Sequence, residues 1–129
     1  MFPSCALITA TILASFAFAT PIAGPSGPVI CGTNVYSAAQ LSSALTRGYS
    51  RLTSPIDSFP HIFNNGEGLP VTPSCSSSRL FEYPLMTGRT YSGGDPGPDR
   101  VVFSATGWYC TVMTHSGAGG NKLTSCMSA

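Results

Sequence analysis

The sequence predicts an α+β domain in which one N-terminal helix packs on a twisted antiparallel sheet of about five strands. One segment near the N-terminus has apolar residues at helical spacing, and short β-favouring runs separated by turn-forming residues follow it. The composition agrees, because 14 Gly and 11 Pro indicate many turns and only 9% of the residues are charged. A chain of 129 residues has room for one such domain.

The helix is predicted in the segment VYSAAQLSSALTRGYS. Ser37 is the expected N-cap, with Gln40 three residues later as its capping-box partner. Arg47 is expected in the last turn, and Gly48 just beyond the helix end. The apolar residues that recur at helical spacing, and so face the sheet, are Ala38, Leu41, Ala44 and Leu45.

Strands are predicted at residues 61–63, 80–85, 100–103, 108–115 and 122–126. The segments SGGDPGPD, SATG and SGAGGN lie between them and favour tight turns. Alternation along a strand directs Arg100 away from the helix-side core. By the same rule one face is shared by Tyr109, Thr111, Met113 and His115. Because the helix covers one face of the sheet, the other is expected to be open to a ligand.

Residues 1–19 are predicted to be a signal peptide, since they are apolar, contain no acidic residue and end in a small-x-small pattern. A membrane anchor is the alternative, but TPIAGPSGP follows in place of a cationic flank and favours export. Residues 20–30 are interpreted as a linker or short pro-segment, and residues 31–129 as the folded domain. The protein is therefore expected to be secreted and extracellular, and not membrane-bound.

Removal of Cys5 with the signal peptide leaves Cys31, Cys75, Cys110 and Cys126. An even number of cysteines in an exported chain indicates two disulfides, and the sequence alone permits three connectivities. No cysteine or histidine spacing suits a zinc site, so neither a metal nor another cofactor is expected. The formal net charge of +1 argues against wrapping a long polyanion and leaves room for a focused site at one phosphate.

Four ionisable residues lie in or beside otherwise apolar strands: His61, Glu82, Arg100 and His115. Each alone has a structural explanation, such as a hydrogen-bonded histidine or an ion pair of Arg100 with Glu82 or Asp99. Together they supply a base, an acid and positive charge, the groups that cleave a phosphodiester beside a 2'-hydroxyl without a metal.

The motifs SFPHIFNNGEG, FEYPL, SGGDPGPDRVVF and MTHSGAGGN occur in the order found in guanyl-specific fungal ribonucleases of the T1/N1 type. The chain resembles that family from about Cys31 to Cys126. The resemblance implies an endoribonuclease that cleaves single-stranded RNA on the 3' side of guanosine. The product would be a 2',3'-cyclic phosphate, which is then hydrolysed to the 3'-phosphate.

The resemblance also implies a role for each of the four residues. Glu82 would be the general base toward the 2'-hydroxyl, and His115 the general acid toward the 5'-oxygen. His61 would be a cation beside Glu82, and Arg100 would stabilise phosphate charge. Because Glu82 must be ionised and a histidine charged, a bell-shaped pH profile is expected.

Guanine recognition is implied for residues 63–67, with Phe63 stacking on the base and Glu67 accepting hydrogen bonds from it. Taken alone, the segment NNGEG is better explained as a polar turn, because Asn-Gly is a common turn dipeptide. Asn121 matches a position whose backbone contacts the base. The substrate-binding residues implied in this way are Phe59, Phe63, Asn64, Asn65, Glu67 and Asn121.

The disulfides implied by the resemblance are Cys31 with Cys126 and Cys75 with Cys110, the second as in a purine-preferring branch of the family. Val35 stands where some relatives have another cysteine. A cis bond before the proline of SFPHIF is a further feature of relatives.

Three departures bear on activity: Phe59 stands where relatives commonly have tyrosine, Gly66 replaces an aromatic that covers guanine in some members, and Leu123 replaces an aromatic beside the leaving group. The alternative function is a catalytically impaired, ribonuclease-like secreted effector that binds RNA or a host protein. A ribosome-targeting toxin is disfavoured by the short loops with few cations. A monomer acting on single-stranded RNA is expected.

Overall fold

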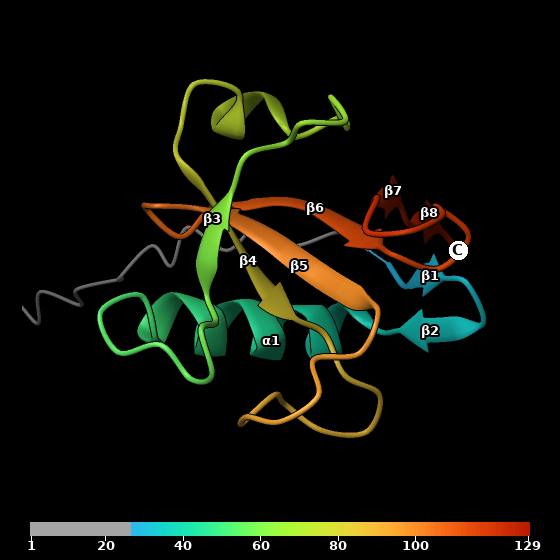
Figure 1. Cartoon of the computed structure of the whole chain (residues 1–129), viewed down its shortest axis with the longest axis horizontal. Coiled ribbons are helices and arrows are strands. Elements are labelled where there is room, and N and C mark those ends of the chain that lie inside the picture. The colour runs from blue at the N-terminus through green and yellow to red at the C-terminus, as the bar shows by residue number, and fades with distance from the viewer. Residues whose placement is uncertain (1–26) are drawn as a thin grey trace, which may run out of the picture.

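The computed structural model describes residues 27–129, so the predicted signal peptide and most of the predicted linker lie outside the described residues. One helix and two antiparallel sheets form the fold, with strand orders β3-β4-β5-β6-β7 and β2-β1-β8 (Figure 1). In chain order the elements are β1 (Val29–Cys31), β2 (Asn34–Tyr36), α1 (Ala38–Ser50), β3 (His61–Phe63), the 3-10 turn η1 (Pro73–Cys75), β4 (Leu80–Pro84), β5 (Asp99–Ser104), β6 (Tyr109–Thr114), β7 (Thr124–Ser125) and β8 (Met127–Ser128).

Helix α1 begins with the predicted capping box, in which the Ser37 side chain accepts from the Gln40 backbone N–H and the Gln40 side chain accepts from the Ser37 backbone N–H. The predicted position of Gly48 is wrong, because the helix continues for two residues beyond it. Gly48 is buried against Phe103 and Tyr83, where a Cβ atom would lie within 3 Å of both side chains. This glycine therefore permits close helix–sheet packing and does not end the helix.

The helix lies across one face of the five-stranded sheet (Figure 1), and the main hydrophobic core fills the space between them. Leu41, Ala44 and Leu45 lie on the buried face of the helix, as predicted, whereas Ala38 in the first turn is only partly buried. The sheet contributes the alternate side chains that point toward the helix, chiefly Tyr83, Val101, Phe103 and Val112.

All five predicted strands are confirmed to within two residues at each end. The predicted face of Tyr109 is wrong, because Phe103 pairs with Tyr109 while Val102 pairs with Thr111. Cys110 is thus the extra residue of a β-bulge, and the alternation of β6 changes phase there. Tyr109 packs against the helix-side core, whereas Met113 belongs to the opposite face.

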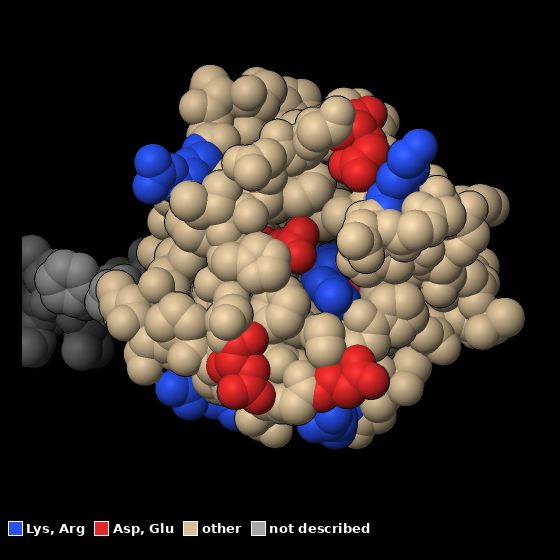
Figure 2. All heavy atoms as spheres, in the orientation of Figure 1, with Lys and Arg blue, Asp and Glu red and all other residues tan. Residues whose placement is uncertain are grey.

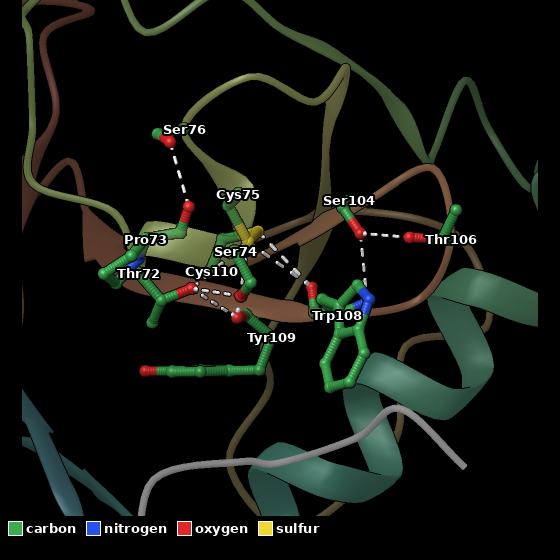
Figure 3. Close-up of a disulfide and its surroundings, with 10 residues drawn as sticks. All are labelled: Thr72, Pro73, Ser74, Cys75, Ser76, Ser104, Thr106, Trp108, Tyr109 and Cys110. Atoms are coloured by element: carbon green, nitrogen blue, oxygen red, sulfur yellow. Dashed lines mark hydrogen bonds between the residues drawn. A yellow bond between two sulfur atoms is a disulfide. The ribbon is translucent and has the colours of Figure 1, made fainter. Parts of the chain in front are cut away.

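The face opposite the helix is only partly open, which corrects the expectation of a free face. A second cluster of buried side chains covers one end of it, formed by Phe63, Cys75, Leu80, Val102, Cys110 and Met113. The Cys75–Cys110 disulfide ties η1 to β6, and Thr72 adds hydrogen bonds to the backbone of Tyr109 and Cys110 (Figure 3). The segment between β3 and β4 is therefore fixed onto the sheet.

The three-stranded sheet was not predicted, because strands of two or three residues are too short to show a period. It contains Val29 and Ile30, which were expected to belong to the linker. The disulfide between Cys31 and Cys126 ties β1 to the residue that separates β7 from β8. Both disulfides have the pairing that the resemblance implies. Within residues 27–129, no helix has the length and apolarity to cross a membrane.

Candidate active site

Four neighbouring strands each bring one of the four ionisable residues to the face opposite the helix. His61 on β3 pairs directly with Glu82 on β4, and β4 pairs in turn with β5, which carries Arg100. His115 directly follows β6, and its backbone N–H donates to the Pro98 carbonyl at 2.9 Å, which continues the ladder between β5 and β6. Directly paired antiparallel residues share a face, and so do residues two apart along one strand, so these four side chains lie on the same face of the sheet.

Glu82 is the centre of the cluster. Its Oε1 atom lies 2.7 Å from His61 Nε2 and 3.7 Å from Arg100 Nε. The residue is only 8% exposed, and a carboxylate buried to this extent requires charged or hydrogen-bonding partners. Figure 2 shows an acidic and a basic side chain side by side near the middle of one face, with the other visible charges at the rim.

Arg100 is 5% exposed and is held mainly by a loop. Its Nη1 group donates to three backbone carbonyl oxygens, those of Pro96 at 3.2 Å, Gly97 at 2.7 Å and Asp99 at 2.9 Å. Burial lowers the pKa of the guanidinium from its ordinary value, and the negative charges of Glu82 and Asp99 oppose this shift. Its Nε atom has no hydrogen-bond partner among the described residues and is directed toward Glu82.

His61 has a hydrogen-bond acceptor at each ring nitrogen. Nδ1 lies 3.1 Å from the Ser58 carbonyl oxygen, and Nε2 faces the Glu82 carboxylate. A carbonyl and an ionised carboxylate only accept, so the doubly protonated ring satisfies both contacts. The centre of the Phe59 ring lies 4.6 Å from the centre of the His61 ring and 5.2 Å from the Arg100 guanidinium carbon, so Phe59 packs against both groups.

His115 is oriented through the nitrogen that faces the protein. Its Nδ1 lies 2.8 Å from the Lys122 carbonyl oxygen, so Nδ1 carries a proton and donates it. The ring is half-exposed, and Nε2 remains as the nitrogen that can give or take a proton. A carboxylate flanked by an imidazole and a guanidinium, with a partly exposed second imidazole on the same face, can perform acid–base chemistry on a phosphate ester. Among residues 27–129 no group of three histidine, cysteine or acidic side chains is placed to hold a metal ion.

The base-binding residues implied by the resemblance lie in two loops beside this cluster. Asn64 and Glu67 are exposed between β3 and η1, and Asn121 is exposed between β6 and β7. The Asn65 side chain accepts from the Leu69 N–H at 2.7 Å and donates to the Leu69 carbonyl at 2.9 Å, so it shapes its own loop.

Phe63, the expected stacking platform, is only 7% exposed and packs in the second hydrophobic cluster. Its position in this cluster gives it a structural role.

Four residues that orient the site were not predicted from the sequence. They act through backbone carbonyls, which any residue type supplies, and they are Ser58, Pro96, Gly97 and Lys122. The only sequence signal was their place in segments rich in turn-forming residues.

Comparisons with known proteins agree with this architecture. A family model described as ribonuclease matches residues 24–127. Guanyl-specific ribonuclease N1 of Neurospora crassa is 39% identical over 102 residues, which cover 75% of this chain and 65% of that protein. The match therefore covers under two thirds of that protein. Guanyl-specific ribonuclease T1 of Aspergillus oryzae is 41% identical over 101 residues, covering 74% of this chain and 75% of that protein.

Among solved structures, a ribonuclease from Hericium erinaceus superposes with a TM-score of 0.58 at 26% identity, covering 78% of this chain and 98% of that chain. Three observations lead to the same conclusion. They are the fold, the common face of the four ionisable residues, and the family match over most of the described domain. The chain belongs to the ribonuclease family.

Proposed function

We propose that this protein is a secreted, monomeric endoribonuclease that cleaves single-stranded RNA on the 3' side of guanosine without a metal. The observation that carries the proposal is the Glu82 carboxylate held between His61 and Arg100 on rigid strands, with the His115 ring on the same face. The names of the related guanyl-specific enzymes support the base preference, and an extracellular relative from Gibberella baccata, 35% identical, supports secretion.

In the proposed first step, Glu82 removes the proton from the 2'-hydroxyl, and the 2'-oxygen attacks the phosphorus. The bond from phosphorus to the 5'-oxygen breaks, and His115 Nε2 gives its proton to that oxygen. Arg100 and the His61 ring balance the negative charge of the phosphorane. The products are a guanosine 2',3'-cyclic phosphate and a free 5'-hydroxyl.

In the second step the roles reverse, because the same path is followed backward with water in place of the 5'-hydroxyl. His115 accepts a proton from water, and Glu82 returns a proton to the 2'-oxygen. The result is a 3'-phosphate. The requirement for an ionised Glu82 and a protonated His115 gives the first step a bell-shaped pH profile.

Base choice is assigned to the exposed loops beside the cluster. We propose that the Glu67 carboxylate accepts the N1-H and N2-H hydrogen bonds of guanine, and that the backbone near Asn64 and Asn121 completes the contact. Gly66 presents no ring to cover the base, so affinity is expected to be lower than in relatives with an aromatic residue there.

The test is cleavage of the dinucleotides GpC, ApC and UpC in EDTA by the oxidised protein. We expect GpC to be cleaved through the cyclic phosphate, and Glu82→Gln combined with His115→Ala to abolish this activity. Ser43→Ala on the outer face of α1 is the matched control and retains full activity. Glu67→Gln should reduce GpC cleavage by about 1–3 kcal/mol, which is about fivefold to 150-fold, and should reduce ApC cleavage far less.

Well-folded protein that cleaves none of the three substrates would refute an enzymatic function. Loss of cleavage in EDTA, restored by a divalent cation, would refute the metal-free mechanism.

A further inference from the structure

Two of the cations in the cluster depend on loops for their orientation. The His61 ring donates to the Ser58 carbonyl at 3.1 Å, in the segment between α1 and β3. The Arg100 guanidinium donates to the Gly97 carbonyl at 2.7 Å and the Pro96 carbonyl at 3.2 Å, in the segment between β4 and β5. If the two loops move relative to each other, the two cations lose their common alignment on Glu82.

Both loops have backbone conformations that need support. Asp57 and Ser58 are consecutive non-glycine residues with φ of 45° and 71°. The left-handed region costs such residues roughly 1–2 kcal/mol each, and aspartate tolerates it through local hydrogen bonds. Across from them, Gly93 and Gly94 have φ of 115° and 84°. A contact that holds these turns together therefore also holds the carbonyl groups beside them.

Asp57 provides this contact. Its Oδ2 atom accepts a hydrogen bond from the Gly94 backbone N–H at 2.7 Å, across 37 residues of sequence. Within the described part of the chain, no other hydrogen bond joins the 51–60 segment to the 86–98 segment. A Cβ atom on Gly93 would lie 3.0 Å from the same oxygen, so the carboxylate is closely seated against the turn.

We propose that Asp57 is a positioning residue that clasps the two loops and thereby keeps His61 and Arg100 aligned on Glu82. This inference rests on the proposed ribonuclease function. Asp57 itself touches neither Glu82 nor the other members of the cluster among the contacts of the described residues, so it acts through Ser58 on one side and Gly97 on the other. The property it supplies is an acceptor atom at a fixed place, which asparagine also possesses.

The test compares Asp57→Ala with Asp57→Asn, and uses Ser54→Ala in the same loop as the matched control. With GpC as substrate, Asp57→Ala should lower kcat about tenfold, because small displacements of catalytic groups are costly, and leave KM within about twofold. Asp57→Asn should restore most of kcat, since its Oδ1 accepts the same N–H. Ser54 is exposed, and its variant should match the wild type.

A second readout is independent of turnover. In the wild type the His61 ring N–H groups should give slowly exchanging NMR signals, assigned by their absence in His61→Gln. The Nδ1–H signal should exchange faster in Asp57→Ala and recover in Asp57→Asn, while the thermal midpoint of all variants stays within a few degrees.

Equal impairment of both Asp57 variants would show that the charge matters and would overturn the clasp. Unchanged kcat and unchanged ring exchange in Asp57→Ala would also overturn it. If the wild type cleaves no GpC, the ribonuclease proposal fails, and the NMR comparison still decides whether Asp57 orders His61.

Discussion

Replacement of Gly48 by alanine tests how closely α1 lies against the sheet. Two effects oppose each other at this position. Alanine is more favourable than glycine in a helix interior by about 1 kcal/mol. The added Cβ, however, would lie 2.8 Å from Phe103 Cε1 and 2.9 Å from Tyr83 Cβ and Cγ.

The steric effect should dominate. Phe103 and Tyr83 are both 0% exposed, so neither ring can move into solvent, and overpacking of such a site costs about 1–3 kcal/mol. With contacts this short we take about 3 kcal/mol, which leaves a net loss of about 2 kcal/mol. For a domain of this size each kcal/mol shifts Tm by about 4–8 °C, so Tm should fall by about 8–16 °C.

Thermal unfolding followed by circular dichroism measures the difference directly. Ser43→Ala is the matched control, because Ser43 lies on the exposed face of the same helix and gains propensity without a clash. Its Tm should rise by at most a few degrees. A rise in the Tm of Gly48→Ala would refute the packing argument, since helix propensity would then outweigh the contact with the sheet.

The remaining predictions concern buried and site groups. Asp99→Ala should lower the free energy of unfolding in urea by about 1–3 kcal/mol, because the carboxylate is 0% exposed and accepts from Tyr36; an unchanged midpoint contradicts this. Burial is the main cause, and Asp99 the second, of the raised pKa of the Tyr36 hydroxyl. The neutral hydroxyl therefore contributes its full stability below the unfolded pKa of about 10, and this contribution is lost as the pH rises from there through the higher folded pKa. Tm should therefore fall less steeply above that pH in Tyr36→Phe, and parallel curves would exclude a contribution. Replacing Cys75 and Cys110 by serine should cost about 4 kcal/mol for a separation of 35 residues, and a loss below about 1 kcal/mol would contradict the chain-entropy account. Phe59→Tyr should raise kcat on GpC about tenfold by adding a phenol donor for phosphate; a decrease would show that the site has no room for it.

The secondary structure was predictable where the signal is local. The Ser37–Gln40 capping box and the apolar spacing of α1 act within one or two turns, and α1 begins where they indicate. The strand period also placed Arg100 away from the helix-side core, and the paired register of β4 and β5 puts Glu82 on the same face. Alternation is a property of each strand alone, so no tertiary information is needed.

The wrong expectations involve contacts between distant segments. Gly48 was interpreted as a helix end because glycine is typical there, yet Phe103 and Tyr83 require it within the helix. Tyr109 was assigned to the wrong face because the bulge at Cys110 depends on how β6 pairs with β5. The residues next to Gly48 do not indicate its contact with the sheet, and the residues next to Cys110 do not indicate the bulge.

The sequence by itself determined which residues could act together: His61, Glu82, Arg100 and His115 are few, ionisable and set in apolar strands, and the motifs around them indicate the family. The tertiary structure alone decided how they are held. Their orienting partners are backbone carbonyls and the carboxylate of Asp57, joined across as many as 37 residues. Local propensity reaches only a few residues along the chain, whereas the alignment of a site depends on which loops the folded core brings together.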